Sequence, residues 1–361
     1  MERRYSVFMN KLRFGILGAA DIARKNWKSI FNSGNAVVTA VASRDLARSR
    51  RFIKELQAEA PFETTPVALG SYEALIASKN VDAAYIPLPT GLRKEWVLCA
   101  AKAGKHVICE KPCALSAADL REMISACCKN RVQFMDGVMF MHNPRLNRIR
   151  EVLDDGQNVG RIKRIMSNFS FHLAEDQFPT NVRMNSRLEP AGCLGDLGWY
   201  CIRFILYVMH GQLPREVTGR ILSRHGASRN HSPVPMDFSV KLIFNDDLSA
   251  GFYCSFIAEY QNWVHLSGTK GQLRVDDFVH PVNDLETAFE VNGRTIRVKA
   301  GDGKRARAET VAQQTNMIRN FANQVFSGKL NDEWPGIALQ TQQVMDACFQ
   351  SAQNGSAGVT P

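Results

Sequence analysis

The sequence HVICEKP occupies residues 106–112 and joins a short apolar run to a carboxylate, an ammonium group and a proline. Its two β-branched residues are typical of a strand buried in a parallel sheet. Glu110 and Lys111 follow where such a strand leaves its sheet, and open α/β sheets bind their ligands there. Pro112 favours an extended conformation at Lys111. Taken alone, the pair also fits two exposed charges at a strand end, so the surrounding sequence decides between the two interpretations.

Short apolar runs alternate with helical patterns around this stretch. The runs predict strands at 12–17, 36–42, 67–70, 81–86, 106–109 and 132–137. Helices are predicted between them, at 21–33, 46–57, 72–78, 93–103 and 117–129. This alternation is typical of a doubly wound parallel sheet, the Rossmann architecture of the α/β class. We place that domain at residues 10–133.

The first predicted strand runs directly into GAADIA, residues 18–23, the position of a dinucleotide-binding loop. Gly18 suits the tight turn, and Ala20 occupies the site where backbone approaches a pyrophosphate, although its methyl group narrows that approach. The amides at the following helix start, at Asp21 and Ile22, would point at phosphate. The same residues also fit a strand–turn–helix unit that binds no ligand.

The second predicted strand ends in Ser43 and Arg44. NAD-binding versions of this fold carry an acidic residue near this point, whereas an arginine suits the 2′-phosphate of NADP. Arg44 can pair with that phosphate through two parallel hydrogen bonds, and Ser43 can donate a third. Asp45 also reads as a helix N-cap, which would make Arg44 an ordinary helix-start residue. We favour NADP(H), with NAD(H) as the alternative.

The carboxyl ends of parallel strands meet at one edge of the sheet. That edge would bring Gly18 and Ser43 together with the triplet 110–112. It would also carry the rigid turn after the fourth strand, formed by Pro87, Leu88, Pro89 and Thr90. Because these segments converge on Lys111, we expect the triplet to lie in a binding site.

The pattern changes after about residue 160, where strand-like segments follow one another without intervening helices. The predicted strands are 162–171, 217–223, 238–244, 248–257, 263–267, 273–275 and 289–298. Asn245-Asp246-Asp247 predicts a hairpin turn, and two helices, 312–326 and 337–352, complete the chain. We therefore expect a second, α+β domain at residues 134–361, built on a large open and mainly antiparallel sheet.

One stretch of the second half is rich in glycine: GCLGDLGWYCIR, residues 192–203. Three glycines within seven residues suggest that backbone approaches a ligand or another chain segment closely. Asp196 and Tyr200 are four residues apart, so on a helix they share one face. Tyr200 also fits a core tyrosine whose hydroxyl is satisfied internally.

Composition excludes several classes of protein. The 361 residues are 45% hydrophobic and 22% charged, which is ordinary for a globular protein with a large core. No apolar run approaches the roughly 20 residues of a membrane span, and the apolar run after Arg3-Arg4 is too short for a signal peptide. The nine cysteines form no CxxC or zinc-spaced cluster, so we expect no metal, free thiols and a cytoplasmic protein.

The net charge of +10 favours attraction to polyanions or phosphorylated ligands. The basic residues are spread along the chain, however, and no basic tail or aromatic-interleaved stripe accompanies them. We therefore expect no nucleic-acid partner and a small-molecule ligand.

Three of these motifs together resemble the glucose–fructose oxidoreductase/inositol dehydrogenase (Gfo/Idh/MocA) family, over nearly the whole chain. They are GILGAADIA at 15–23, EKP at 110–112 and GDLGWY at 195–200. Further segments are similar to the branch of dimeric dihydrodiol dehydrogenase and NADP-linked D-xylose dehydrogenases: ADIARK at 20–25, PLPT at 87–90, MDG at 135–137 and HNPR at 142–145.

The resemblance implies that Lys111 contacts substrate and tunes a proton-transfer residue. Many family members carry a histidine four residues after the aspartate, whereas this chain has Tyr200. The resemblance implies substrate contacts for five residues: Lys111, Asp136, His142, Asp196 and Tyr200. Arg93 stands where many relatives carry a histidine, so the resemblance does not assign the substrate contacts at this position. The family also implies a homodimer or homotetramer formed through the free face of the second sheet.

Oxidation of an alcohol needs a hydride acceptor and a base for the hydroxyl proton. Free tyrosine has a pKa of about 10, and a nearby cation lowers that value. We therefore expect Lys111 to lower the pKa of Tyr200, which acts as acid/base, and Asp196 to orient the lysine or the substrate. The predicted activity is NADP-dependent oxidation or reduction of a sugar, polyol or cyclic diol. The alternatives are a trans-dihydrodiol dehydrogenase and a non-catalytic dinucleotide sensor. We expect the identity of the substrate to depend on the loop 173–190.

Overall fold

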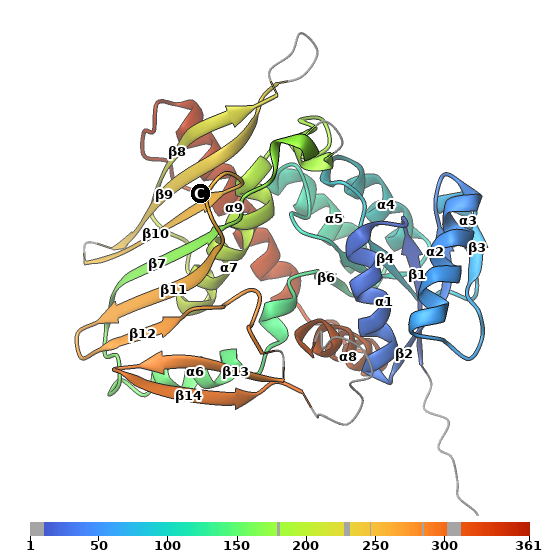
Figure 1. Ribbon diagram of the computed structural model, residues 1–361, viewed down its shortest axis with the longest axis horizontal. Coiled ribbons are helices and arrows are strands. Elements are labelled where there is room, and N and C mark those ends of the chain that lie inside the picture. The colour runs from blue at the N-terminus through green and yellow to red at the C-terminus, as the bar shows by residue number, and fades with distance from the viewer. Residues whose placement is uncertain (1–10, 179–180, 227–231, 246, 284, 302–311) are drawn as a thin grey trace, which may run out of the picture.

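The computed structural model describes residues 11–178, 181–226, 232–245, 247–283, 285–301 and 312–361. Two sheets lie side by side, one formed by the first third of the chain and the other by the second half, with helices α7 and α9 between them (Figure 1). None of the helices in these ranges is long and apolar enough to cross a membrane.

The first sheet is parallel, with strand order β3-β2-β1-β4-β5-β6. This order confirms the predicted doubly wound Rossmann sheet. Its strands are β1 Leu12–Leu17, β2 Ala36–Ala42, β3 Val67–Leu69, β4 Ala83–Ile86, β5 His106–Cys109 and β6 Phe134–Asp136. Its helices are α1 Asp21–Ser33, α2 Leu46–Glu59, α3 Tyr72–Ala77, α4 Thr90–Lys102 and α5 Ala117–Lys129.

Burial explains why these segments are strands. Every residue of β4 and all but the first of β5 are buried, as expected where helices cover both faces of a parallel sheet. Gly15 in β1 permits close packing, because a Cβ there would lie 2.5 Å from Leu75 of α3. The side chain of Asp45 accepts from the Ala47 amide, so the predicted N-cap of α2 is present.

The second sheet has eight strands in the order β14-β13-β12-β11-β7-β10-β9-β8. Neighbours pair antiparallel except β7 and β10, which are parallel. The strands are β7 Ile162–Ser170, β8 Glu216–His225, β9 Val234–Asn245, β10 Leu248–Ser255, β11 Gln261–Gly268, β12 Gln272–Val275, β13 Glu286–Val291 and β14 Arg294–Lys299. The predicted open and mainly antiparallel sheet is therefore confirmed.

One strand prediction is wrong. The segment 289–298 is not a single strand but part of the hairpin of β13 and β14. Asn292 and Gly293 form its turn with φ of 50° and 80°, and these left-handed conformations are those that a two-residue hairpin turn requires. The Asn-Gly pair signalled this turn in the sequence.

The remaining helices attach the second sheet to the first. They are the 3₁₀ turn η1 Met139–His142 and the helices α6 Arg145–Asp154, α7 Trp199–Val208, α8 Ala312–Phe326 and α9 Glu333–Gln353. Helix α9 contacts β8 of the second sheet and β6 of the first, and α8 packs on α1. The side chain of Asn35 donates to the Arg319 carbonyl in α8, at 3.0 Å. Both C-terminal helices thus contribute to the core of the first sheet.

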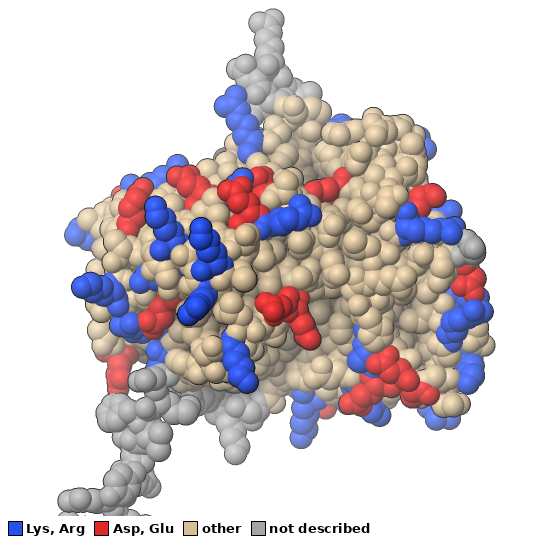
Figure 2. All heavy atoms as spheres, turned by 180° about the vertical axis from the view of Figure 1, so that it is seen from behind, with Lys and Arg blue, Asp and Glu red and all other residues tan. Residues whose placement is uncertain are grey.

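Charged side chains of both signs occur on the face opposite to that of Figure 1. Figure 2 shows basic and acidic side chains intermixed on the left and around the edges of this face, with a broad uncharged area between them. The excess of positive charge is not gathered into one patch on this face.

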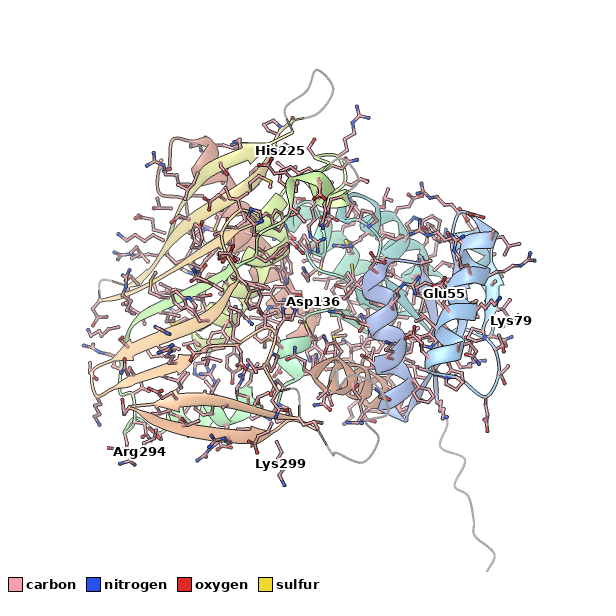
Figure 3. The ribbon with its side chains drawn as sticks, viewed as in Figure 1. Glu55, Lys79, Asp136, His225, Arg294 and Lys299 are labelled. Atoms are coloured by element: carbon pink, nitrogen blue, oxygen red, sulfur yellow. The ribbon has the colours of Figure 1, made fainter. Side chains whose placement is uncertain are left out.

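A buried ion pair connects β6, α7 and α9. Arg203 donates to the two carboxylate oxygens of Asp136 at 3.2 and 2.5 Å, and its Nε donates to Thr341 at 2.8 Å. The indole of Trp199 donates to the same carboxylate at 3.3 Å. Asp136 lies in the interior of the molecule (Figure 3), and the two charged side chains are 4% and 2% exposed. This differs from the expected substrate contact at Asp136, because its oxygens are already occupied by protein donors.

We predict that Asp136→Asn destabilises the protein by about 3–5 kcal/mol, because it leaves the guanidinium of Arg203 buried without a counter-charge. Urea unfolding followed by circular dichroism measures the change. Glu286→Gln is the matched control, since its pair with Arg297 lies 3.5 Å apart on the surface and is worth less than about 1 kcal/mol. Equal effects of the two substitutions would contradict the role of the buried pair.

Candidate active site

Lys111 extends from the end of β5 toward the second half of the chain. Its ammonium group donates to the carboxylate of Asp196 at 2.5 Å and to the carbonyl of the same residue at 2.8 Å. It also lies 4.8 Å from the ring centroid of Tyr200. The structure therefore brings together the three residues predicted to be catalytic, at the carboxyl edge of the parallel sheet.

Asp196 is presented by an irregular turn. Residues Leu194–Gly198 form a π-helical segment that leads into α7, and Tyr200 lies in the first turn of that helix. Gly195 allows this segment to approach the lysine, because a Cβ there would lie 3.2 Å from the ring of Pro112. Glycine therefore serves close approach of two chain segments, as the sequence suggested.

A second cation binds the same carboxylate. Arg183, in the 3₁₀ turn Val182–Met184, donates through Nε to Asp196 at 2.7 Å. Burial alone would raise the pKa of Asp196, but Lys111 and Arg183 reverse this effect and hold the pKa well below its usual range. Burial likewise opposes the charge of Lys111, yet the facing carboxylate raises its pKa. The lysine and the aspartate are both charged at neutral pH.

The expected pKa of Tyr200 is wrong in sign. Burial raises the pKa of Tyr200 to about 12, although the ammonium of Lys111 acts to lower it. The ring contacts the rings of Phe140 and Phe169, at centroid distances of 6.1 and 5.6 Å. The loss of water around the phenol therefore outweighs the lysine, and Tyr200 retains its proton at neutral pH.

Glu110 points away from the lysine into the core of the first sheet. Its carboxylate accepts from the hydroxyl of Tyr85 at 2.7 Å, and the same hydroxyl accepts from Asn26 at 2.5 Å. Burial raises the pKa of Glu110. Gly137 is required beside it, because a Cβ there would lie 2.9 Å from the carboxylate. This network fixes the side chain of Glu110 and thereby the backbone of the 110–112 triplet.

The glycine loop has the geometry of a phosphate-binding turn. Gly18 has a φ of 113°, which a residue with a side chain rarely adopts. Helix α1 begins after Ala20, which is extended and provides no side-chain cap, so the amides of Asp21 and Ile22 have no capping side chain, while the Ala23 amide donates to the Ala20 carbonyl at 3.0 Å. Asp21 and Ile22 are exposed beside them. Arg48 of α2 donates to the Ala19 carbonyl at 2.8 Å and adds positive charge to the loop.

The end of β2 lies against this loop, since the Gly18 amide donates to the Ala42 carbonyl at 2.8 Å. Ser43 is buried and accepts from the Asp45 amide at 3.3 Å, which leaves its hydroxyl hydrogen free to donate. Arg44 is exposed, and no described residue forms an ion pair with it. A positive-φ glycine, an uncapped helix start and an exposed arginine fit a dinucleotide that carries a 2′-phosphate.

Arg93 is buried, and its guanidinium group is occupied by hydrogen bonds to the surrounding chain. It donates through Nε to the Leu88 carbonyl at 2.6 Å and through Nη1 to the Thr90 hydroxyl and the Pro112 carbonyl. It therefore ties the turn that begins at the buried Pro87 to the lysine triplet.

Glu189 attaches the same turn to the segment 173–190. Its carboxylate accepts from the Thr90 amide at 2.9 Å and from the Thr90 hydroxyl at 2.6 Å. The adjacent Gly91 amide donates to the Leu188 carbonyl at 2.9 Å. The carboxylate caps the start of α4, where Pro89 offers no side-chain cap.

His142 lies away from the lysine. Its Nδ1 is 3.2 Å from the amide nitrogen of Asn320, and its ring packs edge-on against Trp334 at 5.8 Å. Burial lowers its pKa to about 4. The structure thus gives His142 a packing role near α8 and α9, which differs from the expected substrate contact.

Sequence reasoning missed Arg183 and Glu189. Both lie in a segment that has no strand or helix periodicity, and neither belongs to a motif. Their partners are known only once the segment is placed against the first sheet.

Two family models match the chain. Residues 12–138 match the model described as "Oxidoreductase family, NAD-binding Rossmann fold", and residues 146–274 match the "GFO/IDH/MocA C-terminal domain". Among curated proteins, D-xylose 1-dehydrogenase (NADP(+)) 2 of Haloferax volcanii is 28% identical over 96% of this chain and 99% of its own length. Trans-1,2-dihydrobenzene-1,2-diol dehydrogenase of Mus musculus is 32% identical over 78% of both chains.

Solved structures show the same architecture. A 3-ketoreductase from Actinomadura kijaniata, in complex with NADP and TDP-benzene, superposes with a TM-score of 0.80 at 25% identity, covering 94% of this chain and 98% of its own. The aldose-aldose oxidoreductase of Caulobacter crescentus, complexed with glycerol, shares the fold, with a TM-score of 0.80 at 21% identity over 98% of this chain and 100% of its own.

Proposed function

Because the chain belongs to the Gfo/Idh/MocA family of oxidoreductases, we propose that it is an NADP-dependent enzyme that oxidises or reduces a sugar, a polyol or a cyclic diol. The observation that carries this proposal is the Lys111–Asp196–Tyr200 cluster at the ligand edge of the parallel sheet. The relatives that act on D-xylose with NADP(+) and on a trans-dihydrodiol support the class of substrate.

The glycine loop, the start of α1, Ser43 and Arg44 would hold NADP(H), with Pro87, Leu88 and Thr90 forming the opposite wall. The cofactor supplies or accepts the hydride. Arg44 and Arg48 would bring positive charge to its phosphates, and Glu110 would keep the triplet in place through its network with Tyr85.

Tyr200 is the proton donor of the proposed reaction. Its pKa of about 12 keeps it protonated at neutral pH, so it can transfer a proton to the oxygen of a carbonyl that is being reduced. Lys111 lies over its ring and would donate a hydrogen bond to the same oxygen, which stabilises the negative charge that develops there. Asp196 holds the lysine in position, and Arg183 holds the aspartate.

The cyclic-diol alternative has its own support. Aromatic side chains surround Tyr200, because Phe140 and Phe169 contact it and Phe278 contacts both. These rings are buried, and they make the surroundings of Tyr200 apolar, which suits an apolar ring as well as the apolar face of a sugar. A non-catalytic sensor would need no proton donor beside the lysine, so the complete cluster argues for catalysis.

The second sheet provides a surface for self-association. Asn168, Tyr253 and Trp263 are cross-strand neighbours on one face of β7, β10 and β11, while Ile165 and Phe169 alternate with them on the buried face. We propose that two copies meet through this aromatic face.

Light scattering after gel filtration should give a dimer or tetramer for the native protein. Trp263→Glu should shift it toward the monomer, since it places a charge in the proposed interface. His210→Glu, far from this face on the loop after α7, is the control. A monomeric native protein would refute the proposal.

The cofactor assignment predicts that fluorescence titration detects tighter binding of NADPH than of NADH. Arg44→Asp should reverse this preference, because a carboxylate repels the 2′-phosphate and accepts from a ribose hydroxyl. Arg51→Asp, on the exposed side of α2, should leave it unchanged. Equal binding of both nucleotides would show that Arg44 does not contact the cofactor. If neither nucleotide bound, the proposed NADP-dependent activity would be refuted.

The proton-donor role predicts that Tyr200→Phe and Lys111→Met each lower kcat by about 10²–10⁴-fold with little change in NADPH affinity. Because the pKa of Tyr200 is raised, its acid form persists across neutral pH and reduction should vary little from pH 6 to 9. Oxidation needs the phenolate, so its kcat/KM should rise by nearly tenfold per pH unit over the same range. Unchanged turnover in both variants, or oxidation that is independent of pH, would contradict this assignment.

A further inference from the structure

His280 lies between β12 and β13 on a segment that is held firmly through its main chain. Its carbonyl accepts from the side chain of Asn262 at 3.2 Å, and the Val279 amide donates to the same side chain at 2.9 Å. Gln313 of α8 donates to the Val279 carbonyl at 2.7 Å. The backbone at His280 is thereby fixed from two sides.

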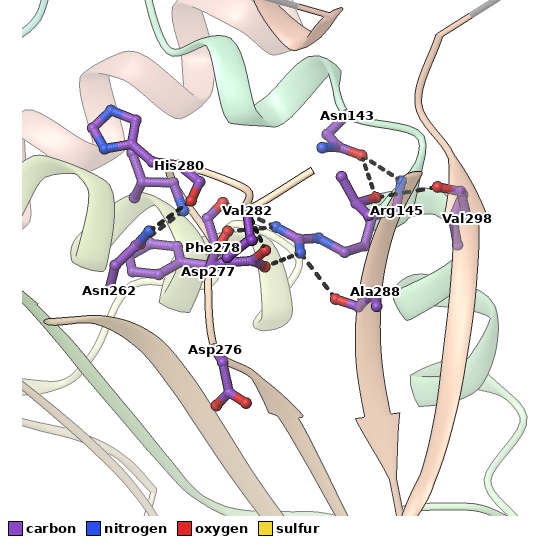
Figure 4. A network of polar contacts seen from close by, with 12 residues as sticks. Asn143, Arg145, Asn262, Asp276, Asp277, Phe278, His280, Val282, Ala288 and Val298 are labelled. Atoms are coloured by element: carbon purple, nitrogen blue, oxygen red, sulfur yellow. Dashed lines mark hydrogen bonds and ion pairs between the residues drawn. The ribbon is translucent and has the colours of Figure 1, made fainter. Parts of the chain in front are cut away.

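A buried arginine anchors the preceding residues. Arg145 is 2% exposed and forms an ion pair with Asp277. It also donates to the main-chain carbonyls of Asp277 at 2.9 Å and Phe278 at 3.3 Å, and to that of Ala288 in β13 at 2.9 Å. Figure 4 shows this network, with the imidazole of His280 pointing away from it. The network holds the segment and leaves the ring free.

The imidazole faces the active site. It packs edge-on against Phe169 at 5.7 Å, and Phe169 packs in the same way against Tyr200 at 5.6 Å. The charges of Lys25 in α1, Lys111 and Asp196 all act on the imidazole. The ring therefore lies near Lys111 and Asp196, with Phe169 between it and Tyr200.

The His280 side chain is exposed to solvent, and no described residue forms a hydrogen bond with either ring nitrogen. Both nitrogens are therefore open to a ligand. By contrast, Nδ1 of His142 lies 3.2 Å from the side-chain amide of Asn320, and His106 accepts from the Gln133 amide at 2.9 Å. The surrounding protein atoms and the charges of Lys25 and Lys111 lower the pKa of His280, although part of the side chain reaches solvent, so the imidazole is neutral at neutral pH. A neutral imidazole offers one donor and one acceptor.

We propose that His280 binds hydroxyl groups of the substrate, donating through one ring nitrogen and accepting through the other. The fixed backbone and the contact with Phe169 keep this donor–acceptor pair near Lys111 and Asp196, where it can recognise hydroxyls close to the reacting carbon. This inference rests on the proposed function and narrows its substrate class to polyhydroxylated molecules, sugars or polyols, for which such a group adds affinity that an apolar ring alone would not gain.

His280→Phe tests the proposal, because it keeps the ring contact with Phe169 and removes both nitrogens. NADPH titration first establishes that the variant binds cofactor as the native protein does. Calorimetric titration of the NADP(H)-bound protein with D-xylose and with xylitol then measures polyol affinity, and steady-state assays give kcat and KM. We expect Kd and KM to rise about tenfold, the effect of losing one or two neutral hydrogen bonds, with kcat changed less than twofold.

Two further variants separate recognition from packing. His280→Gln retains a donor and an acceptor and should restore part of the affinity. His210→Phe is the matched control, since that imidazole is 66% exposed on the loop after α7, and it should leave polyol affinity unchanged. Deoxy analogues of D-xylose should lose affinity for the native protein, and one of them should lose none for His280→Phe.

The outcomes distinguish this inference from the proposed function. Native affinity for D-xylose and xylitol in His280→Phe would overturn the inference, as would failure of the native NADPH complex to bind either polyol. If the polyols bind, the binding depends on His280 and yet no sugar or polyol is turned over, the inference stands and the proposed activity fails.

Discussion

The buried ion pair of Asp136 and Arg203 determines where Tyr200 lies. Arg203 is three residues beyond Tyr200 on α7, and Asp136 ends the strand next to β5, from which Lys111 extends. A charge buried at this depth is tolerated only when its partner is in place. The pair therefore fixes α7 against β6 and α9 at one position, and this position sets the tyrosine ring 4.8 Å from the lysine ammonium. Asp136, which we expect from the sequence to contact substrate, instead positions the helix that carries Tyr200.

The two halves of the chain differ in how far their sequence foretells their structure. Strands β1 and β2 and helices α1 and α5 begin and end at the predicted residues, because apolar runs bounded by glycine, proline or a capping residue leave little choice of limits. Lys111, Asp196 and Tyr200 could be proposed because each belongs to a motif. Arg183, Glu189 and His280 could not, since they lie on connecting segments whose positions depend on contacts with residues far away in the sequence.

Tyr200 shows a second limit of sequence reasoning. That a lysine would lie beside it followed from the motifs, and the lysine does act to lower its pKa. The sign of the net shift depends on how much water the phenol loses among Phe140 and Phe169, and no motif encodes that quantity. The outcome changes the chemistry, because a protonated phenol favours donation to a carbonyl over abstraction from an alcohol.

The carboxylate of Glu189, which caps the start of α4, makes the stability of the first sheet depend on the second half of the chain. Helix α4 begins at a proline turn with no cap of its own, so part of its stability comes from a residue about one hundred positions later in the chain. Helix α8 completes the same half by packing on α1. The cofactor-binding half is thus not a transferable module: if it were cut out at residue 133, it would lose a helix cap and an entire covering helix. Because the second sheet is inserted between the first sheet and its last helices, we expect the chain to unfold as one cooperative unit.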